Sequence, residues 1–226
     1  AENMAIKAIE VLQSEKPTKE LATAFSNYCQ LKMLSDNADE CLVWGKKAIE
    51  IAEILNLNDI KSHTYNNMGC VLVFNPETSH RGWDYLNLSL SLALKHGYQE
   101  HAARAYTNLC STSTVIKNYP LAESMLEEGI KYCYEHDLDS WAYYKLSWKA
   151  RVLQERGRWD EAEEVAAKLL NNPSHPDIVK ISALVVMGTL KIRTGEGQAA
   201  LSLFNEAKGM ALSMQEVQRS VPLTCA

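Results

Sequence analysis

The sequence predicts an all-α fold, a right-handed α–α superhelix of about five helix-turn-helix units preceded by an extra helix. The first observation is a series of small residues at a nearly constant spacing of 38 to 41 residues: Cys41, Gly82, Ala122, Ala162 and Ala200. A second series runs twelve or thirteen residues ahead of the first: Cys29, Gly69, Cys110, Ala150 and Gly188. A period of this size is the signature of a helical repeat array. Each unit therefore has two close-packing points, which indicate two paired helices.

The extra helix is expected over about residues 2–15, where Met4, Ala5, Ala8 and Ile9 fall largely on one side of a helix. It would cap the beginning of the array. Helix pairs are then expected at 18–34 with 38–56, 59–74 with 77–96, 99–116 with 119–136, 139–156 with 159–171, and 177–194 with 196–213. The corresponding units are 18–57, 58–97, 98–137, 138–174 and 175–213, and residues 214–226 are expected to begin a truncated further repeat.

The prolines and two glycines support these boundaries. A helix interior rejects proline, whereas a first turn accepts it. All six prolines lie at or between expected helices: Pro17, Pro76, Pro120, Pro173, Pro176 and Pro222. Gly157 and Gly195 stand where the first helix of a pair must end, which is the place where a left-handed residue is favoured. A β fold would need short alternating runs, and stretches such as DEAEEVAAKLL show helical spacing instead.

Composition and charge exclude several classes of protein. Of the 226 residues, 46% are hydrophobic and 23% are charged, which is ordinary for a globular protein. We expect residues 1–226 to form a single domain that was cut from a larger protein. A net charge of -5 lacks the basic excess of a nucleic-acid-binding domain. No apolar run approaches the roughly 18 residues that cross a bilayer. The six scattered cysteines and the absence of a secretory signal favour a cytoplasmic location.

Within each unit the residues resemble a tetratricopeptide repeat (TPR). The resemblance rests on Asn67-Met68-Gly69 in one first helix, on the turn Gly157-Arg158-Trp159-Asp160-Glu161-Ala162, and on Asn118-Tyr119-Pro120-Leu121-Ala122 one unit earlier. It covers roughly residues 18–213. The units are four to seven residues longer than the family's usual 34, and Cys41 and Gly82 replace the usual alanine. The resemblance implies a solenoid that presents a concave surface to a protein partner.

A narrower resemblance connects the segments EHAARAYTNL, LAESMLEEGIKYCYEHDLDSW and KARVLQERGRWDEAEEVAAKLL to the helical region of large bacterial ATP-binding regulators. Those proteins join an AAA-type nucleotide-binding module to such repeats and carry a LuxR-type DNA-binding domain or a nucleotide cyclase domain. This implies the sensing or scaffolding arm of a signal-transduction or transcription protein. The chain contains no GxxxxGK[ST] phosphate loop, so any ATP hydrolysis of that kind would belong to other domains.

No catalytic, cofactor or metal constellation stands out in the sequence. The six histidines are dispersed, and the nearest approach to a metal cluster, His96, Glu100 and His101, has a spacing of five across Gly97 rather than the four of a helical zinc motif. No cysteine pair has the C-x-x-C spacing. We therefore expect no enzymatic activity, no cofactor and no metal in this segment.

Binding has better candidates. Asn27, Asn67 and Asn108 take one equivalent position, two residues before each small residue of the second series. In TPR domains that position tends to line the concave groove, where an amide can contact a peptide backbone as donor and acceptor. The alternative is that these amides tie neighbouring helices together or face water. The full set of residues expected on the concave face is Asn27, Gln30, His63, Asn67, Arg104, Asn108, Tyr144 and Arg151.

Two arginines and one tyrosine complete this set. Arg104 stands where carboxylate-clamping TPR domains often carry a cation, although Ser26 and Gln30 replace the rest of that clamp, and a surface ion pair is the alternative for Arg104. Arg151 would share the inner face, so an anionic ligand could use both arginines. Most of the segment from Trp141 to Trp148 is expected to pack between units, with Tyr144 facing outward.

The sequence thus leads to two hypotheses of function. The first is a non-catalytic scaffold that binds a protein or peptide, or another domain of the same polypeptide, in its groove. The second is a sensor in which a small-molecule inducer binds the concave channel and controls an attached nucleotide-binding module. A sensor should show a bounded and mostly apolar pocket, whereas a scaffold should show a long open groove. Neither requires nucleic acid or membrane contact by this segment.

Overall fold

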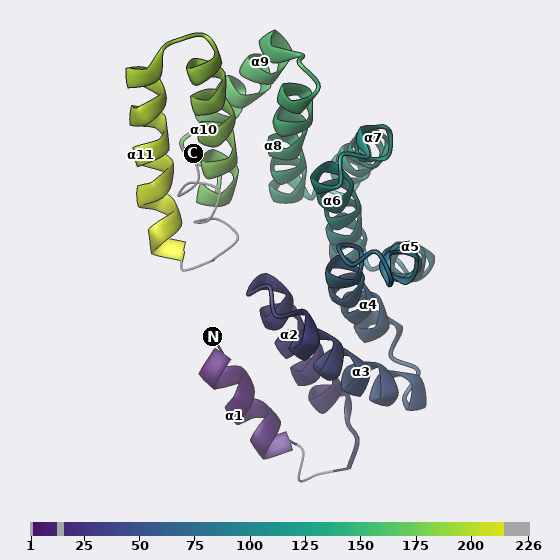
Figure 1. The fold of residues 1–226 in the computed structure, drawn as a ribbon. Coiled ribbons are helices and arrows are strands. Elements are labelled where there is room, and N and C mark those ends of the chain that lie inside the picture. Colours follow the sequence, from purple (N-terminus) through teal and green to yellow (C-terminus); the bar gives the residue numbers. More distant parts are fainter. Residues whose placement is uncertain (1, 13–15, 215–226) are drawn as a thin grey trace. The chain divides into compact units, whose positions relative to one another are not determined.

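The computed structural model describes residues 2–12 and 16–214, which form eleven helices and no strand (Figure 1). In chain order they are α1 Glu2–Leu12, α2 Lys19–Leu34, α3 Ala38–Ile54, α4 Asn58–Leu72, α5 Ser79–His96, α6 Gln99–Val115, α7 Tyr119–Glu135, α8 Asp139–Glu155, α9 Trp159–Leu170, α10 Asp177–Arg193 and α11 Gly197–Met214. The predicted all-α fold is confirmed, with an extra helix followed by five helix pairs.

Helix limits agree with the predicted ones to within two or three residues. Inside the array the largest differences are two residues: α3 and α4 end at Ile54 and Leu72 rather than at 56 and 74, and α5 begins at Ser79 rather than at 77. The start of α5 has a local cause. The reason is a turn built on Asn75, whose side-chain oxygen accepts from the Glu77 amide at 3.0 Å while its carbonyl accepts from the Thr78 amide at 3.0 Å. The predicted ends at residues 13–15 and the predicted further repeat at 215–226 lie outside the described residues.

The chain divides into two compact units, Ala1–Thr112 and Ser113–Ala226, with the division falling inside α6. In unit 1, each of the helices α1 to α4 packs against the next helix, and α2 also contacts α4. In unit 2, α7 to α11 pack in the same consecutive way, and α8 also contacts α10. Contact between the first helices of successive pairs is what stacks helical hairpins into a solenoid.

Polar caps and left-handed turns set where the helices begin and end. The side chains of Thr18, Asn37 and Asn118 accept the backbone amide of the third residue that follows, at 3.1 to 3.4 Å, which caps α2, α3 and α7. Residues with positive φ follow the helix ends. Gly157 and Gly195 have φ of 78° and 83°, as the sequence predicted, and Lys117 takes the same left-handed conformation with φ of 62°.

The two series of small residues pair as expected between α4 and α5. A Cβ added to Gly82 would lie 2.6 Å from the Val73 amide nitrogen, and one added to Gly69 would lie 2.9 Å from the Gly82 carbonyl oxygen. Only glycine permits the two backbones to approach this closely. One hairpin earlier, the buried Cys29 and Cys41 bring their sulfur atoms to 3.4 Å. In the last hairpin a Cβ added to Gly188 would instead meet a side chain, lying 2.8 Å from the ring of Phe204.

The apolar core runs along the helix interfaces of each unit. In unit 1 the α1 side chain of Ile9 joins α2 and α3 residues such as Phe25 and Ala48 in one cluster. In unit 2 residues of α8, α9 and α10 form another cluster, which includes Ala162 and Val186. Helix α4 packs against α2, α3 and α5, and none of its residues is exposed. No helix within the described ranges 2–12 and 16–214 combines the length and apolarity that a membrane span requires.

Candidate functional site

Unit 1 contains a buried polar cluster, which we define as Ser26 and Gln30 of α2, His63 and Thr64 of α4, and Arg104 of α6. The imidazole of His63 is its centre. Its Nδ1 lies 2.7 Å from Ser26 Oγ, and its Nε2 lies 3.0 Å from Arg104 Nη1 and 3.2 Å from Gln30 Oε1. Ser26 Oγ lies 2.7 Å from Thr64 Oγ1. Three first helices are thus linked by side-chain hydrogen bonds.

The hydrogen-bond directions in this cluster follow from Arg104. A guanidinium only donates, so Nε2 of His63 accepts and the ring proton resides on Nδ1, which donates to Ser26. The Ser26 hydroxyl then donates to Thr64, and the Thr64 hydroxyl donates to the Ile60 carbonyl at 2.7 Å. Because Nε2 is an acceptor, Gln30 can bond to it only through its amide nitrogen, which would share the one lone pair of Nε2 with Arg104. The chain of donors ends on the backbone of α4.

The His63 imidazole is held neutral. Its side chain is 8% exposed, and burial, with the charge of Arg104 and the neighbouring His101, lowers its pKa to about 3. The His101 ring centroid lies 5.7 Å from that of His63, and burial and Arg104 lower the pKa of His101 as well. The cluster therefore keeps one fixed charge, the guanidinium, among neutral donors and acceptors.

This geometry does not activate Ser26 as a nucleophile. A general base must accept the hydroxyl proton, whereas Nδ1 of His63 donates to Ser26 and the other ring nitrogen is occupied by Arg104. Ser26 is also 2% exposed, out of reach of a substrate. What the arrangement can do is fix the relative register of α2, α4 and α6, because a directional polar network is satisfied in one arrangement only.

The three asparagines predicted to form one track lie in three different environments. Asn27 is exposed, Asn67 is completely buried, and Asn108 is half-buried with its side-chain nitrogen donating to Asn66 Oδ1. Neither amide atom of Asn67 has a hydrogen-bond partner among the described residues. A continuous track of three amides along an open groove is therefore absent from the described residues. The bond from Asn108 to Asn66 instead ties α6 to α4, which was the alternative considered for these amides.

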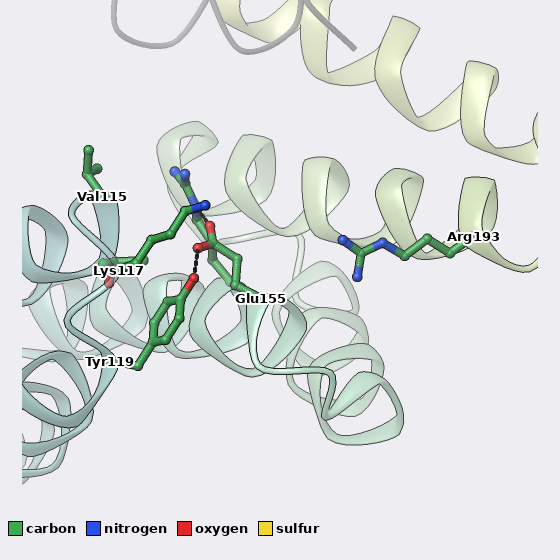
Figure 2. A pocket seen from close by; sticks show the side chains of 7 residues that line it. Val115, Lys117, Tyr119, Glu155 and Arg193 are labelled. Carbon is green, nitrogen blue, oxygen red and sulfur yellow. Dashed lines mark hydrogen bonds and ion pairs between the residues drawn. The ribbon is translucent and has the colours of Figure 1, made fainter.

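Unit 2 contains an open pocket at the carboxyl ends of its first helices (Figure 2). Its volume is about 350 Å³. The lining consists of the last turn of α6, the following turn, and residues of α7, α8 and α10: Thr114, Val115, Lys117, Tyr119, Arg151, Glu155 and Arg193. We call this the basic pocket, because three of its side chains are cationic and one is a carboxylate.

Glu155 organises one side of the basic pocket. Its Oε1 accepts from Arg151 Nε at 2.8 Å, and its Oε2 accepts from the Tyr119 hydroxyl at 3.0 Å (Figure 2). Burial, and then this hydrogen bond, raise the pKa of Tyr119. The guanidinium of Arg151 also lies 5.2 Å from the Trp148 ring. Arg151, a predicted site residue, thus reaches a pocket with its charge neutralised by Glu155.

The positive charges of Lys117 and Arg193 are not neutralised. Neither side chain forms an ion pair with a carboxylate of residues 2–12 or 16–214. Arg193 stacks on an aromatic ring instead, with its guanidinium 5.2 Å from the centre of Trp159. Figure 2 shows Lys117 extending toward the Tyr119–Glu155 pair and Arg193 approaching from α10. The basic pocket therefore has an excess of positive charge in a chain whose net charge is -5.

The remaining predicted residues and the metal candidate are placed as follows. Tyr144 is half-buried and packs against the apolar cluster of unit 2, so it faces inward more than predicted. Arg104 donates to His63 within unit 1. His101 lies against His63 and Tyr98, at ring distances of 5.7 and 6.0 Å. Within the described part of the chain, no three His, Cys, Asp or Glu side chains form a group able to hold a metal ion.

Sequence reasoning missed Lys117, Tyr119, Glu155 and Arg193. A signal for them was present. Val115, Glu155 and Arg193 each stand five residues after a small residue of the second series, so they share one repeat position. Lys117 stands at the position that Gly157 and Gly195 occupy in the next two units. Comparing the units at these positions, rather than only along the predicted groove, would have brought the pocket residues together.

Comparison with known proteins supports the fold alone. No family model matches the sequence, and no curated protein matches it. Among solved structures, the chain is similar to the crystal structure of BtubC (BKLC) from P. vanneervenii, with a TM-score of 0.66 over 94% of this chain and 90% of that chain. The sequence identity is 15%, so this similarity concerns the helical architecture and transfers no function.

Proposed function

We propose that this chain is a non-catalytic interaction module that binds a segment of a partner protein, with the basic pocket of unit 2 as a contact point. The observation that carries the proposal is the pocket itself, an open cavity at the carboxyl ends of α6, α8 and α10 with uncompensated charge. A stacked-hairpin fold is typically used to present such extended surfaces. The buried polar cluster of unit 1 supports the same role by holding its helices in one register.

The lining of the pocket favours a protein segment over an apolar inducer. A small-molecule site usually has 300 to 1,000 Å³ and mostly hydrophobic walls. At about 350 Å³ the basic pocket is at the lower end of that range. Six of its seven lining residues are charged or carry a hydroxyl, and Val115 is the exception. Such a pocket fits one polar side chain of a longer ligand. We further propose that the module regulates the protein that carries the bound segment, or an adjoining domain. This part of the proposal rests only on the resemblance to bacterial regulators.

The proposal is tested by selecting binders from a library of random unstructured peptides on the full chain. The comparison variant is Val115→Trp, which places an indole in the pocket without changing charge, at a side chain that is 48% exposed. Peptides selected on the native chain are expected to lose at least tenfold in affinity for this variant, while its thermal melting stays the same. Failure to select any peptide, or equal affinity for both chains, overturns the proposal.

A further inference from the structure

We infer that the basic pocket recognises a carboxylate side chain, glutamate or aspartate, of an acidic partner segment, and that Lys117 and Arg193 are the recognising residues. The inference rests on the proposed function and names the chemistry of its ligand. Three observations carry it: the charge left over in the pocket, the backbone conformation at Lys117, and the support of Arg193 by an aromatic ring.

The charge argument begins with the pairs already formed. Arg151 and Glu155 neutralise each other at 2.8 Å, and Tyr119 occupies the second oxygen of Glu155. Lys117 and Arg193 remain as two cations without an ion pair among the described residues, facing the same cavity. Two cations converging on one open space attract an anion, and a guanidinium offers a planar pair of donors that matches a carboxylate. The ligand that complements the pocket is therefore anionic.

The backbone at Lys117 indicates that the lysine is kept for function. Its φ of 62° is left-handed, a conformation that side chains with a Cβ disfavour and that glycine adopts freely. The equivalent turns of the next two units use Gly157 and Gly195, at φ of 78° and 83°. The equivalent turn of the first helix pair uses Asp36, at φ of 56°, and aspartate tolerates this conformation better than lysine does. A lysine in this conformation at the rim of a charged cavity points to a role for its side chain.

Glu155 sets which anion fits. Because this carboxylate lies in the pocket, a phosphoryl dianion would place two negative charges beside it, whereas a carboxylate places one. The cavity of about 350 Å³ also opens to solvent and accommodates the end of a side chain while the rest of the segment lies outside. Arg193 is pre-oriented for this contact because its guanidinium stacks on Trp159 at 5.2 Å, which lowers the entropy cost of ordering it.

The test uses three blocked pentapeptides with glycine at the odd positions. The two even positions carry glutamate, glutamine or phosphoserine. Binding to the full chain is measured by isothermal titration calorimetry, which does not depend on any side chain replaced below. In the native chain the indole N–H resonance of Trp159 also reports on Arg193 above its ring. The glutamate peptide is expected to give a saturable shift that weakens with salt, the glutamine twin to bind at least tenfold more weakly, and the phosphoserine twin to bind no more tightly than the glutamate peptide.

Variants identify the residues. Lys117→Gly and Arg193→Gln are each expected to weaken binding of the glutamate peptide about threefold to tenfold, and the double variant to reach the level of the glutamine twin. Lys149→Gln removes the same charge from an exposed position of α8 outside the pocket and is expected to leave binding unchanged. Lys117→Gly is further expected to melt no lower than the native chain, so its loss of binding is separable from misfolding.

The outcomes separate this inference from the proposed function. Equal binding of the glutamate and glutamine peptides, tenfold tighter binding of the phosphoserine peptide, or unchanged binding by both Lys117→Gly and Arg193→Gln overturns the inference. In those cases the loss of selected peptides on Val115→Trp still supports the module as a segment binder. No binding by any of the three peptides also overturns the inference, and the peptide selection then decides the proposed function by itself.

Discussion

The buried polar cluster of unit 1 and the basic pocket of unit 2 contain similar side chains but differ in what those side chains do. Each contains a hydrogen-bonded arginine: Arg104 donates to His63 on another helix, and Arg151 donates to Glu155 one turn later on its own helix. In unit 1 every ring nitrogen and hydroxyl around His63 is engaged, and Ser26 and His63 are almost inaccessible. In unit 2 the Arg151–Glu155 pair is completed while Lys117 and Arg193 are left facing solvent. A closed network stabilises a fold, whereas an open one with surplus charge attracts a ligand.

Burial determines how much the hydrogen bonds of each region contribute to the stability of the fold. A typical hydrogen bond adds about 0.5–1.5 kcal/mol to the free energy of unfolding, because the exposed groups can bond to water when the pair is broken. A buried group that loses its partner cannot reach water and lowers the free energy of unfolding by about 1–3 kcal/mol. The unit 1 cluster is therefore expected to dominate stability and the unit 2 pocket to dominate binding. Three measurements test this division, beginning with the largest expected effect.

The largest effect is expected from His63→Leu, which removes the centre of the unit 1 cluster. Ser26 loses the ring proton it accepts, and Arg104 loses the nitrogen to which it donates, both in a buried setting. We expect a destabilisation of about 2–4 kcal/mol, measured by urea unfolding followed by circular dichroism. The matched variant Tyr119→Phe removes one hydrogen bond at the open pocket and is expected to cost less than about 1 kcal/mol. Equal losses in the two variants would contradict the division of roles.

The second effect is a dependence of stability on pH that comes from His63. Its pKa is about 3 in the folded chain and about 6.5 in an unfolded one, so between these values the unfolded chain binds the extra proton. Stability is then complete above pH 6.5 and falls as pH decreases toward 3. The slope is about 1.4 kcal/mol per pH unit, which gives a loss of about 2 kcal/mol between pH 7 and pH 5.

His63→Gln is the control for this pH dependence, because glutamine keeps a hydrogen-bonding side chain that does not titrate. Urea unfolding at pH 7, 6 and 5 is expected to show a much flatter profile for this variant. A residual slope of the same sign is expected from His101, whose pKa burial also lowers. If the native chain and His63→Gln lose equal stability between pH 7 and pH 5, the buried neutral imidazole is not the cause.

Much of the fold could be predicted from the sequence, because it is set by local and periodic features. The prolines and the turn residues Gly157 and Gly195 marked helix ends, and the small residues marked close helix contacts such as Gly69 against Gly82. Asn67 shows where this reasoning stops. Its repeat position predicts a groove, but α4 packs on α2, α3 and α5 together and buries that position. How many neighbours surround a helix is a tertiary property that spacing does not encode.

The basic pocket was missed for a related reason. It is assembled from helix ends and a turn, so its members are separated along the chain and only Arg151 lies on the predicted inner face. Lys117 could have been noticed as the one lysine where the following units have glycine. Its conformation, however, is a backbone observation, and the sequence alone indicates a turn without its φ. Side chains that act at turns are therefore harder to predict than those on helix faces.

The smallest expected change in stability comes from Lys117→Gly, and it is a stabilisation, whereas His63→Leu is expected to destabilise the chain. Lys117→Gly relieves a left-handed conformation that costs a residue with a Cβ about 1–2 kcal/mol, while the extra freedom of unfolded glycine costs about 0.5–1 kcal/mol. The net expectation is a stabilisation of about 0.5–1 kcal/mol in urea unfolding. Asp137→Gly, at φ of 56°, is expected to gain less, because aspartate tolerates this conformation better than lysine does. A destabilised Lys117→Gly would mean that this lysine contributes to the fold, and the separation between a stabilising cluster and a binding pocket would no longer hold.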